Sequence, residues 1–254
     1  MIFIRSLLFN LFMVLSVALC CIPVALASPF TFGKRFGHWV AVNWVRGQLF
    51  VLKHLCRLDY RVEGRENIPQ QNAIVYWKHQ SAWETLAQFL VFPAQSWVIK
   101  RELMWVPLLG QALYTLEPIA INRKAGHSAV QQVLEIGVER LKEGLWIAIF
   151  PEGTRMPPGT TRRYGLSGAL LAKRTGRPIV PVAHNAGDFW KRNAFLKYPG
   201  TVTVRIGKPV YANGRRPDEV NAEIQDWIEA QMKDISPGYA GNQLGGKNVV
   251  GGVD

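Results

Sequence analysis

The chain has 254 residues, a length that fits one sizeable domain together with an anchoring segment. Its formal net charge of +12 stands beside 48% hydrophobic residues, and this combination favours the surface of an anionic membrane over the cytosol. Nucleic acid is not expected as a partner, because the sequence contains no recognition helix, zinc finger or RNA-binding signature. Cys20, Cys21 and Cys56 form neither a disulfide framework nor a metal-binding pair of pairs, so we predict no metal site.

The N-terminus contains an uncharged, apolar run from Leu7 to Ala27. About twenty apolar residues suffice to cross the hydrocarbon core of a bilayer, so residues 1–28 are expected to span or insert into a membrane. A cleaved signal peptide is the alternative, because Arg5 precedes the run and Ala25-Leu26-Ala27 has the small-residue pattern of a cleavage site. More basic residues follow the run than precede it, which predicts that the main domain lies on the cytoplasmic side of the membrane.

Residues 29–57 combine aromatic and basic side chains, including Trp39, Trp44, Arg46 and Lys53. Amphipathic helices of this kind favour the headgroup layer, so we expect this segment to lie in the interface and to contact anionic membrane lipids. A buried helix of the main domain is the alternative.

From residue 58 to residue 235, short apolar strands alternate with amphipathic helices. Strands are predicted at residues 73–77, 97–99, 145–150, 178–182 and 202–206. One helix is expected between Ser128 as its cap and Gly144 as its stop, and a last helix from Pro217. This alternation predicts one α/β domain with a mixed, largely parallel sheet flanked by helices. Residues 236–254 are rich in glycine and are expected to form a flexible tail.

The first segment whose side chains suit catalysis is Lys78 to Thr85, directly after the strand that ends at Trp77. A histidine at a strand end can act as a general base when a carboxylate one helical turn later holds one of its ring nitrogens. His79 and Glu84 have this spacing. By itself such a pair is more often structural, and it lacks the second histidine of the helical zinc motif.

The second such segment is Phe150 to Arg155, immediately after the most apolar strand. Loops at the ends of α/β strands are where ligands bind, and the planar guanidinium of Arg155 suits a phosphate. Gly153 allows the backbone to approach a ligand closely. An ordinary Pro-Gly turn is the alternative.

Together these segments resemble the glycerolipid acyltransferases, in particular the bacterial 1-acyl-sn-glycerol-3-phosphate acyltransferases, whose hallmark is a histidine followed after four residues by aspartate. Four blocks are similar to those of the family in order and spacing, at residues 79–84, 118–123, 150–155 and 179–182. Residues 100–103 and 107–110 also resemble the family's connecting segment, and the resemblance covers residues 36–232. One departure is Glu84, which stands where the family normally has aspartate.

The resemblance implies transfer of an acyl chain from acyl-CoA or acyl carrier protein to the free hydroxyl of lysophosphatidic acid, giving phosphatidic acid. It implies no cofactor beyond this thioester co-substrate. His79 would be the general base and Glu84 its orienting partner, while main-chain N–H groups after His79 or around Gly153 would bind the oxyanion. The implied substrate-binding residues are Lys100, Arg123, Glu152, Gly153, Thr154 and Arg155.

Three other functions stay open at this point. The acceptor can be another lysolipid, such as a lysophospholipid with a larger headgroup or a lyso-ornithine lipid, since the motifs do not define the pocket walls. A thioesterase, in which water replaces the lipid hydroxyl, is more distant, and so is a non-catalytic membrane-binding protein.

Overall fold

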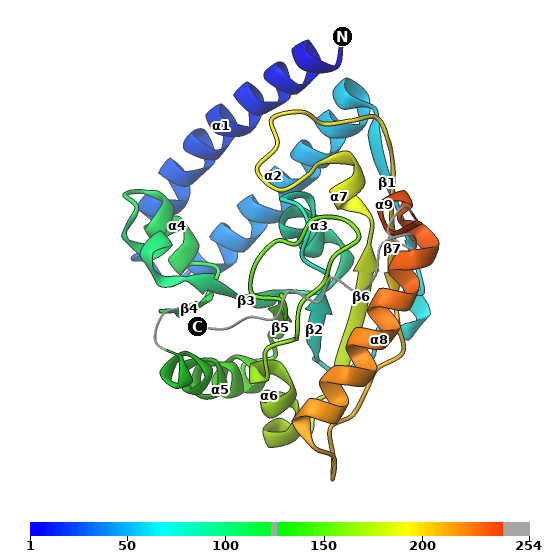
Figure 1. The fold of residues 1–254 in the computed structure, drawn as a ribbon. Helices are drawn as coiled ribbons and strands as arrows, with labels where there is room; N and C mark the ends of the chain where they lie inside the picture. Colours follow the sequence, from blue (N-terminus) through cyan, green and yellow to red (C-terminus); the bar gives the residue numbers. More distant parts are fainter. Residues whose placement is uncertain (123–125, 241–254) are drawn as a thin grey trace.

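The structure, a computed structural model, describes residues 1–122 and 126–240 (Figure 1). The strands of its sheet are β1 (Leu58–Glu63), β2 (Ile74–Trp77), β3 (Gln95–Lys100), β4 (Ile119–Ile121), β5 (Trp146–Ile149), β6 (Ile179–His184) and β7 (Gly200–Ile206). The longer helices are α1 (Ile2–Ala27), α2 (Gly33–Cys56), α3 (Trp83–Val91), α5 (His127–Lys142), α6 (Ser167–Thr175) and α8 (Pro217–Ile235). The short helical elements are η1 (Arg65–Asn67), η2 (Arg101–Trp105), α4 (Leu109–Tyr114), α7 (Ala186–Phe189) and α9 (Pro237–Ala240).

The seven strands follow the order β1-β7-β6-β2-β5-β3-β4. Neighbouring strands are parallel except for β6 and β7, which are antiparallel. The predicted mixed, largely parallel sheet is therefore confirmed. The middle strands β2, β5 and β6 are buried along their whole length and run parallel to one another, so their carboxyl ends meet at one edge of the sheet.

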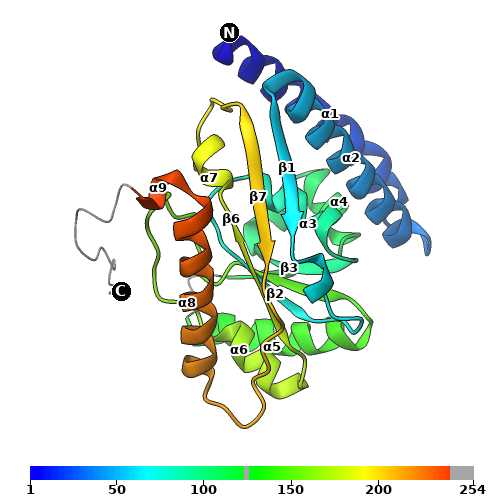
Figure 2. The ribbon, with the colours of Figure 1, turned by 90° about the vertical axis from the view of Figure 1, so that its right-hand side faces the viewer.

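Alternate residues of β2 face opposite sides of the sheet, as the two-residue period of a strand requires. Val75 and Trp77 belong to an apolar cluster that includes residues of α2 and α3. Ile74 and Tyr76 belong to a second cluster, which includes residues of α5, α6 and α8. In Figure 2, α8 accordingly lies on one side of the sheet, and α1 and α2 lie on the other. This burial on both faces explains the continuous apolar runs of the middle strands.

The elements that the sequence did not reveal lie mainly at the sheet edges. β1 is a partly exposed edge strand whose charged residues interrupt its apolar pattern, and the apolar run of β4 has only three residues. α5 begins at His127 with Gly126 as its N-cap, and Ser128 therefore lies inside the helix. The predicted stop at Gly144 is confirmed, since α5 ends at Lys142 and Gly144 has a φ of 87°.

Three polar side chains of α1, those of Ser6, Asn10 and Ser16, are bound by the rest of the protein. Ser16 accepts hydrogen bonds from Trp44 Nε1 at 3.0 Å and from Gln48 Nε2 at 2.8 Å, both on α2. Ser6 accepts the main-chain N–H of Lys197 at 2.9 Å. α1 thus packs along α2, as both ribbon views show, while being long and apolar enough to cross a membrane.

α2 is amphipathic. Val45, Leu49 and Leu52 on its inner face belong to the core, whereas Trp39 and Phe50 are each 63% exposed. The buried-helix alternative for residues 29–57 therefore describes one face of α2. Interfacial binding stays a prediction that concerns the other face.

The C-terminal end of the domain differs from the sequence prediction. Residues 237–240 form α9, and Tyr239 is buried, with its hydroxyl donating to the carbonyl of Thr160 at 3.1 Å. A buried tyrosine can hold such a short helix in place despite the glycine-rich surroundings. The predicted tail of residues 236–254 therefore includes an ordered beginning, and residues 241–254 lie outside the described residues.

Candidate active site

The two segments with candidate catalytic and substrate-binding residues meet at the edge of the sheet where the parallel strands have their carboxyl ends. Residues 78–82 connect β2 to α3, and residues 150–155 follow β5. Because β2 and β5 are parallel neighbours, the two loops lie side by side, at the edge where α/β sheets bind ligands. The ring of His79 stacks on that of Phe150, with centroids 4.1 Å apart and planes inclined by 25°.

Glu84 holds His79 through a buried hydrogen bond. Its Oε1 lies 2.9 Å from His79 Nδ1 and also accepts the main-chain N–H groups of Gln80 at 2.9 Å and Ser81 at 2.8 Å. The glutamate arm thus folds back over the first turn of α3 and still reaches the imidazole. An ionised carboxylate only accepts, so Nδ1 carries the proton and Nε2 is left as the acceptor.

Electrostatics favour the ionised form of Glu84. Burial opposes ionisation, but the hydrogen bond from His79 and the main-chain N–H of Ser81 stabilise the carboxylate, and the pKa of Glu84 lies below its ordinary value. Burial in turn lowers the pKa of His184, which favours a neutral imidazole at this position. Glu84 is therefore a carboxylate at neutral pH, as an orienting partner must be.

The peptide that precedes His79 is held from both sides. The main-chain N–H of His79 donates to Glu152 Oε2 at 2.9 Å, and His184 Nε2 donates to the carbonyl of Lys78 at 2.6 Å. His184 Nδ1 accepts the N–H of Ala186, which fits the neutral tautomer with its proton on Nε2. His184 was not identified from the sequence. Its position directly after the fourth block, at the end of β6 beside β2, is the signal that could have revealed it.

A buried ion-pair network lies beneath this peptide. Lys78 Nζ lies 2.7 Å from Glu152 Oε1 and 2.7 Å from Glu229 Oε1 on α8, and the side chains of Lys78 and Glu152 are fully buried. Burial raises the pKa of Glu152, although the ammonium of Lys78 opposes this shift. Both carboxylate oxygens of Glu152 thus bind this chain's own groups, and one of them holds the main-chain N–H of His79.

His79 lines a cavity of about 420 Å³ together with three of the predicted substrate-binding residues. These are Lys100, Thr154 and Arg155, and Arg192 and Asn193 from the connection between β6 and β7 also line the cavity. Lys100 lies 3.5 Å from Glu102 at the surface, whereas Arg155 Nε is buried and has no hydrogen-bond partner among the described residues. Gly153 is exposed at a φ of 68° and lines a neighbouring cavity. Arg123 lies outside the described residues.

Three of the main-chain donors in the two loops already donate to groups of this chain. The N–H groups of Gln80 and Ser81 donate to Glu84, and that of Gly153 donates to the carbonyl of Phe150 at 2.9 Å. Oxyanion binding by other main-chain N–H groups of these two loops stays a prediction. Within residues 1–122 and 126–240, no three His, Cys, Asp or Glu side chains are arranged to hold a metal ion.

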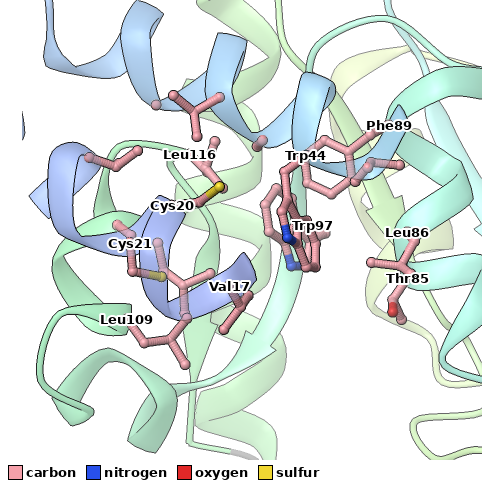
Figure 3. A pocket seen from close by; sticks show the side chains of 17 residues that line it. Val17, Cys20, Cys21, Trp44, Thr85, Leu86, Phe89, Trp97, Leu109 and Leu116 are labelled. Atoms are coloured by element: carbon pink, nitrogen blue, oxygen red, sulfur yellow. The ribbon is translucent and has the colours of Figure 1, made fainter. Parts of the chain in front are cut away.

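An apolar pocket of about 230 Å³ borders the His79 cavity (Figure 3). Its walls come from α1, α2, α3, β3 and α4, and they include Cys21, Trp44, Phe89 and Leu109. Thr85 and Trp97 line both spaces. The arrangement therefore places an almost entirely apolar volume next to a cationic one.

Comparison with known proteins gives a consistent result. A family described as Acyltransferase matches residues 59–185, from β1 to the residue before α7. Over 82% of its length the chain is 41% identical to a 1-acyl-sn-glycerol-3-phosphate acyltransferase of Pseudomonas aeruginosa, 81% of which is covered. It is 30% identical to the human 1-acyl-sn-glycerol-3-phosphate acyltransferase alpha, over 74% of this chain and 67% of that protein.

A solved structure shares the fold. The 1-acyl-sn-glycerophosphate (LPA) acyltransferase PlsC of Thermotoga maritima superposes with a TM-score of 0.75 and 22% identity, covering 92% of this chain and 97% of that one. The sequence match and the geometry around His79 together show that this chain belongs to the acyltransferase family.

Proposed function

We propose that this protein transfers an acyl chain from acyl-CoA or acyl carrier protein to the free hydroxyl of lysophosphatidic acid, giving phosphatidic acid for phospholipid biosynthesis. The observation that carries the proposal is the cavity in which His79, oriented by Glu84, stands beside Lys100 and Arg155. A base and fixed cations in one cavity suit an acceptor that has both a hydroxyl and a phosphate. The names of the relatives support the same acceptor.

The reaction follows from the tautomer of His79. Its Nε2 takes the proton of the acceptor hydroxyl as the oxygen attacks the thioester carbonyl, and Glu84 stabilises the imidazolium that forms. The new C–O bond forms, the C–S bond breaks, and the leaving thiolate takes the proton from the imidazolium. A thiol has an ordinary pKa of about 8.5, so this leaving group departs without strong acid assistance. The reaction needs no covalent enzyme intermediate and no cofactor beyond the thioester.

The apolar pocket supports a lipid substrate. Thr85 and Trp97 line both this pocket and the His79 cavity, so a hydrocarbon chain in the pocket would lie close to the base. Burial of each methylene of such a chain contributes about 0.8 kcal/mol. The pocket is therefore proposed to hold an acyl chain while the cations bind the phosphate.

The N-terminal helices support a membrane location. Leu8, Leu11, Leu15 and Leu19 of α1 are exposed, whereas Ser6 and Ser16 of the same helix are bound by the domain. We place this apolar face in the inner membrane, with the catalytic domain on the cytoplasmic side. The enzyme would then meet its lipid acceptor within the membrane and its thioester donor from solution.

An acyl-transfer assay tests the proposal. Purified protein in anionic vesicles is supplied with lysophosphatidic acid and either acyl-CoA or acyl carrier protein, and the products are separated. We expect phosphatidic acid in proportion to the free thiol released. Thiol release with free fatty acid as the product would instead identify a thioesterase, and acylation of other lysolipids alone would replace the proposed acceptor.

A further inference from the structure

Arg192 lies in the connection between β6 and β7, beyond the residues that the family matches. None of the four sequence blocks includes it. It nevertheless lines the same cavity as His79, together with Lys100 and Arg155. The fold therefore brings a third strong cation to the cavity from a part of the chain that carries no motif.

The guanidinium of Arg192 is fixed to the loop after β5. Arg192 Nη1 donates to the main-chain carbonyl of Arg155 at 3.1 Å. A guanidinium has five N–H donors in a planar fork. The hydrogen bond to the carbonyl of Arg155 uses one of them, so further donors of Arg192 are available for a ligand. This hydrogen bond joins the side chain of Arg192 to the main chain of Arg155, so it connects the two loops that carry these arginines.

The loop that carries Arg192 is also held at its other end. The main-chain N–H of Lys197 donates to Ser6 of α1, and Lys197 Nζ donates to Asn10 of the same helix. The ammonium of Lys197 lies 4.6 Å from the centroid of the Trp190 ring. A segment fixed on both sides of Arg192 loses little conformational freedom when a ligand binds.

The charges around the cavity are those of an anion site. Among the described residues that line it, the ionisable ones are His79, Lys100, Arg155 and Arg192, and no carboxylate is among them. Arg155 Nε is buried without a partner, which costs free energy unless a ligand accepts its hydrogen bond. An anion that bound Arg155 and Arg192 together would satisfy this donor.

We propose that Arg192 is a specificity-determining residue that, together with Arg155, selects acceptors with a terminal phosphomonoester. This inference rests on the proposed function and deepens it. A phosphomonoester carries a charge of about −1.5 to −2 at neutral pH and three terminal oxygens, which two guanidinium forks can bind. A phosphodiester lysolipid carries one charge and two such oxygens, so it gains less from a second arginine.

The test compares two acceptors that have the same acyl chain, lysophosphatidic acid and lysophosphatidylglycerol, in the same vesicles. For Arg192→Gln we expect the KM for lysophosphatidic acid to rise about tenfold or more, as for loss of a charged hydrogen bond. The KM for lysophosphatidylglycerol and the donor KM should change little. The ratio of the KM values for the two acceptors should therefore shift away from lysophosphatidic acid. Arg192→Lys should show an intermediate effect, because it keeps the charge and loses the fork.

Lys191→Gln is the matched control, since it removes the same charge from the neighbouring position but does not line the cavity. Thermal unfolding of each variant confirms that it is folded. Kinetics of Arg192→Gln that match those of Lys191→Gln would overturn the inference, and so would equal KM rises for the two acceptors. Failure of the unmodified enzyme to acylate lysophosphatidic acid would instead contradict the proposed function itself.

Discussion

The carboxylate of Glu152 accepts the main-chain N–H of His79 at 2.9 Å, so the loop after β5 fixes the backbone of the base that follows β2. The same carboxylate binds Lys78 Nζ, which reaches Glu229 on α8. The position of the imidazole therefore depends on residues from three separate elements. The buried pair of Lys78 and Glu152 can be tested by substitution.

Lys78→Met should destabilise the protein strongly. The variant leaves the buried carboxylate of Glu152 without its cation, and breaking a buried pair in this way costs about 3–5 kcal/mol. Denaturant unfolding in detergent measures the free energy of unfolding. The double variant Lys78→Met with Glu152→Gln should recover part of the loss, because it removes the uncompensated charge. A single variant as stable as the parent would show that the network does not support the site.

His184→Gln should reduce the acid sensitivity of the protein. Burial lowers the pKa of His184, so the unfolded chain binds its proton more readily than the folded protein. The stability linked to this group is present above the unfolded pKa of about 6.5 and is lost as the pH falls, by up to about 1.4 kcal/mol per pH unit. Glutamine can still donate to the carbonyl of Lys78.

The measurement is the midpoint of thermal unfolding between pH 7.5 and pH 5. The parent should lose stability over this range, and His184→Gln should lose less. A residual slope is expected from His38, whose pKa burial also lowers. Identical slopes for parent and variant would mean that His184 does not titrate as the structure implies.

Arg155→Lys should separate acceptor binding from chemistry. The charge is kept but the planar fork is lost, so the acceptor KM should rise roughly tenfold or more while the donor KM changes little. The main-chain carbonyl that binds Arg192 is unchanged in this variant. Arg177→Lys, at a partly exposed arginine that binds Gln71, is the control. A loss confined to kcat would indicate that Arg155 stabilises the transition state instead.

Deletion of residues 1–28 should affect stability and membrane binding differently. Phe9 is fully buried with its ring 5.6 Å from that of Trp190, so the truncated protein should lose about 3 kcal/mol or more of stability. It should nevertheless keep appreciable membrane association through Trp39 and Phe50 of α2. Flotation with anionic vesicles at low salt measures the association. A truncated protein that is folded but fails to float would show that α2 serves only the core.

The sequence predicted the site best where candidate catalytic residues directly follow an apolar strand. His79, Glu84 and the segment from Phe150 to Arg155 follow buried strands, and parallel pairing of β2 with β5 brings them together as expected. Edge strands lacked a sufficient signal, because β1 and β4 are short or partly exposed.

Contacts between distant residues could not be read from local pattern. Lys78 meets Glu229 across 151 positions, and no local pattern links the two residues. Arg192 reaches the cavity through the path of the β6 to β7 connection, which no periodicity predicts. Glu152 was found as part of its motif, but its hydrogen bond with the main-chain N–H of His79 could not be read from that motif.

The most direct test of the account is the rate of phosphatidic acid formation by His79→Ala in anionic vesicles, at saturating thioester and lysophosphatidic acid. Removal of the general base should lower kcat by about a hundredfold to ten-thousandfold. The variant should stay folded and membrane-bound, and His54→Ala, at an exposed histidine of α2, should keep the parent rate. A folded His79→Ala protein that forms phosphatidic acid at close to the parent rate would contradict the assignment of His79 as the base.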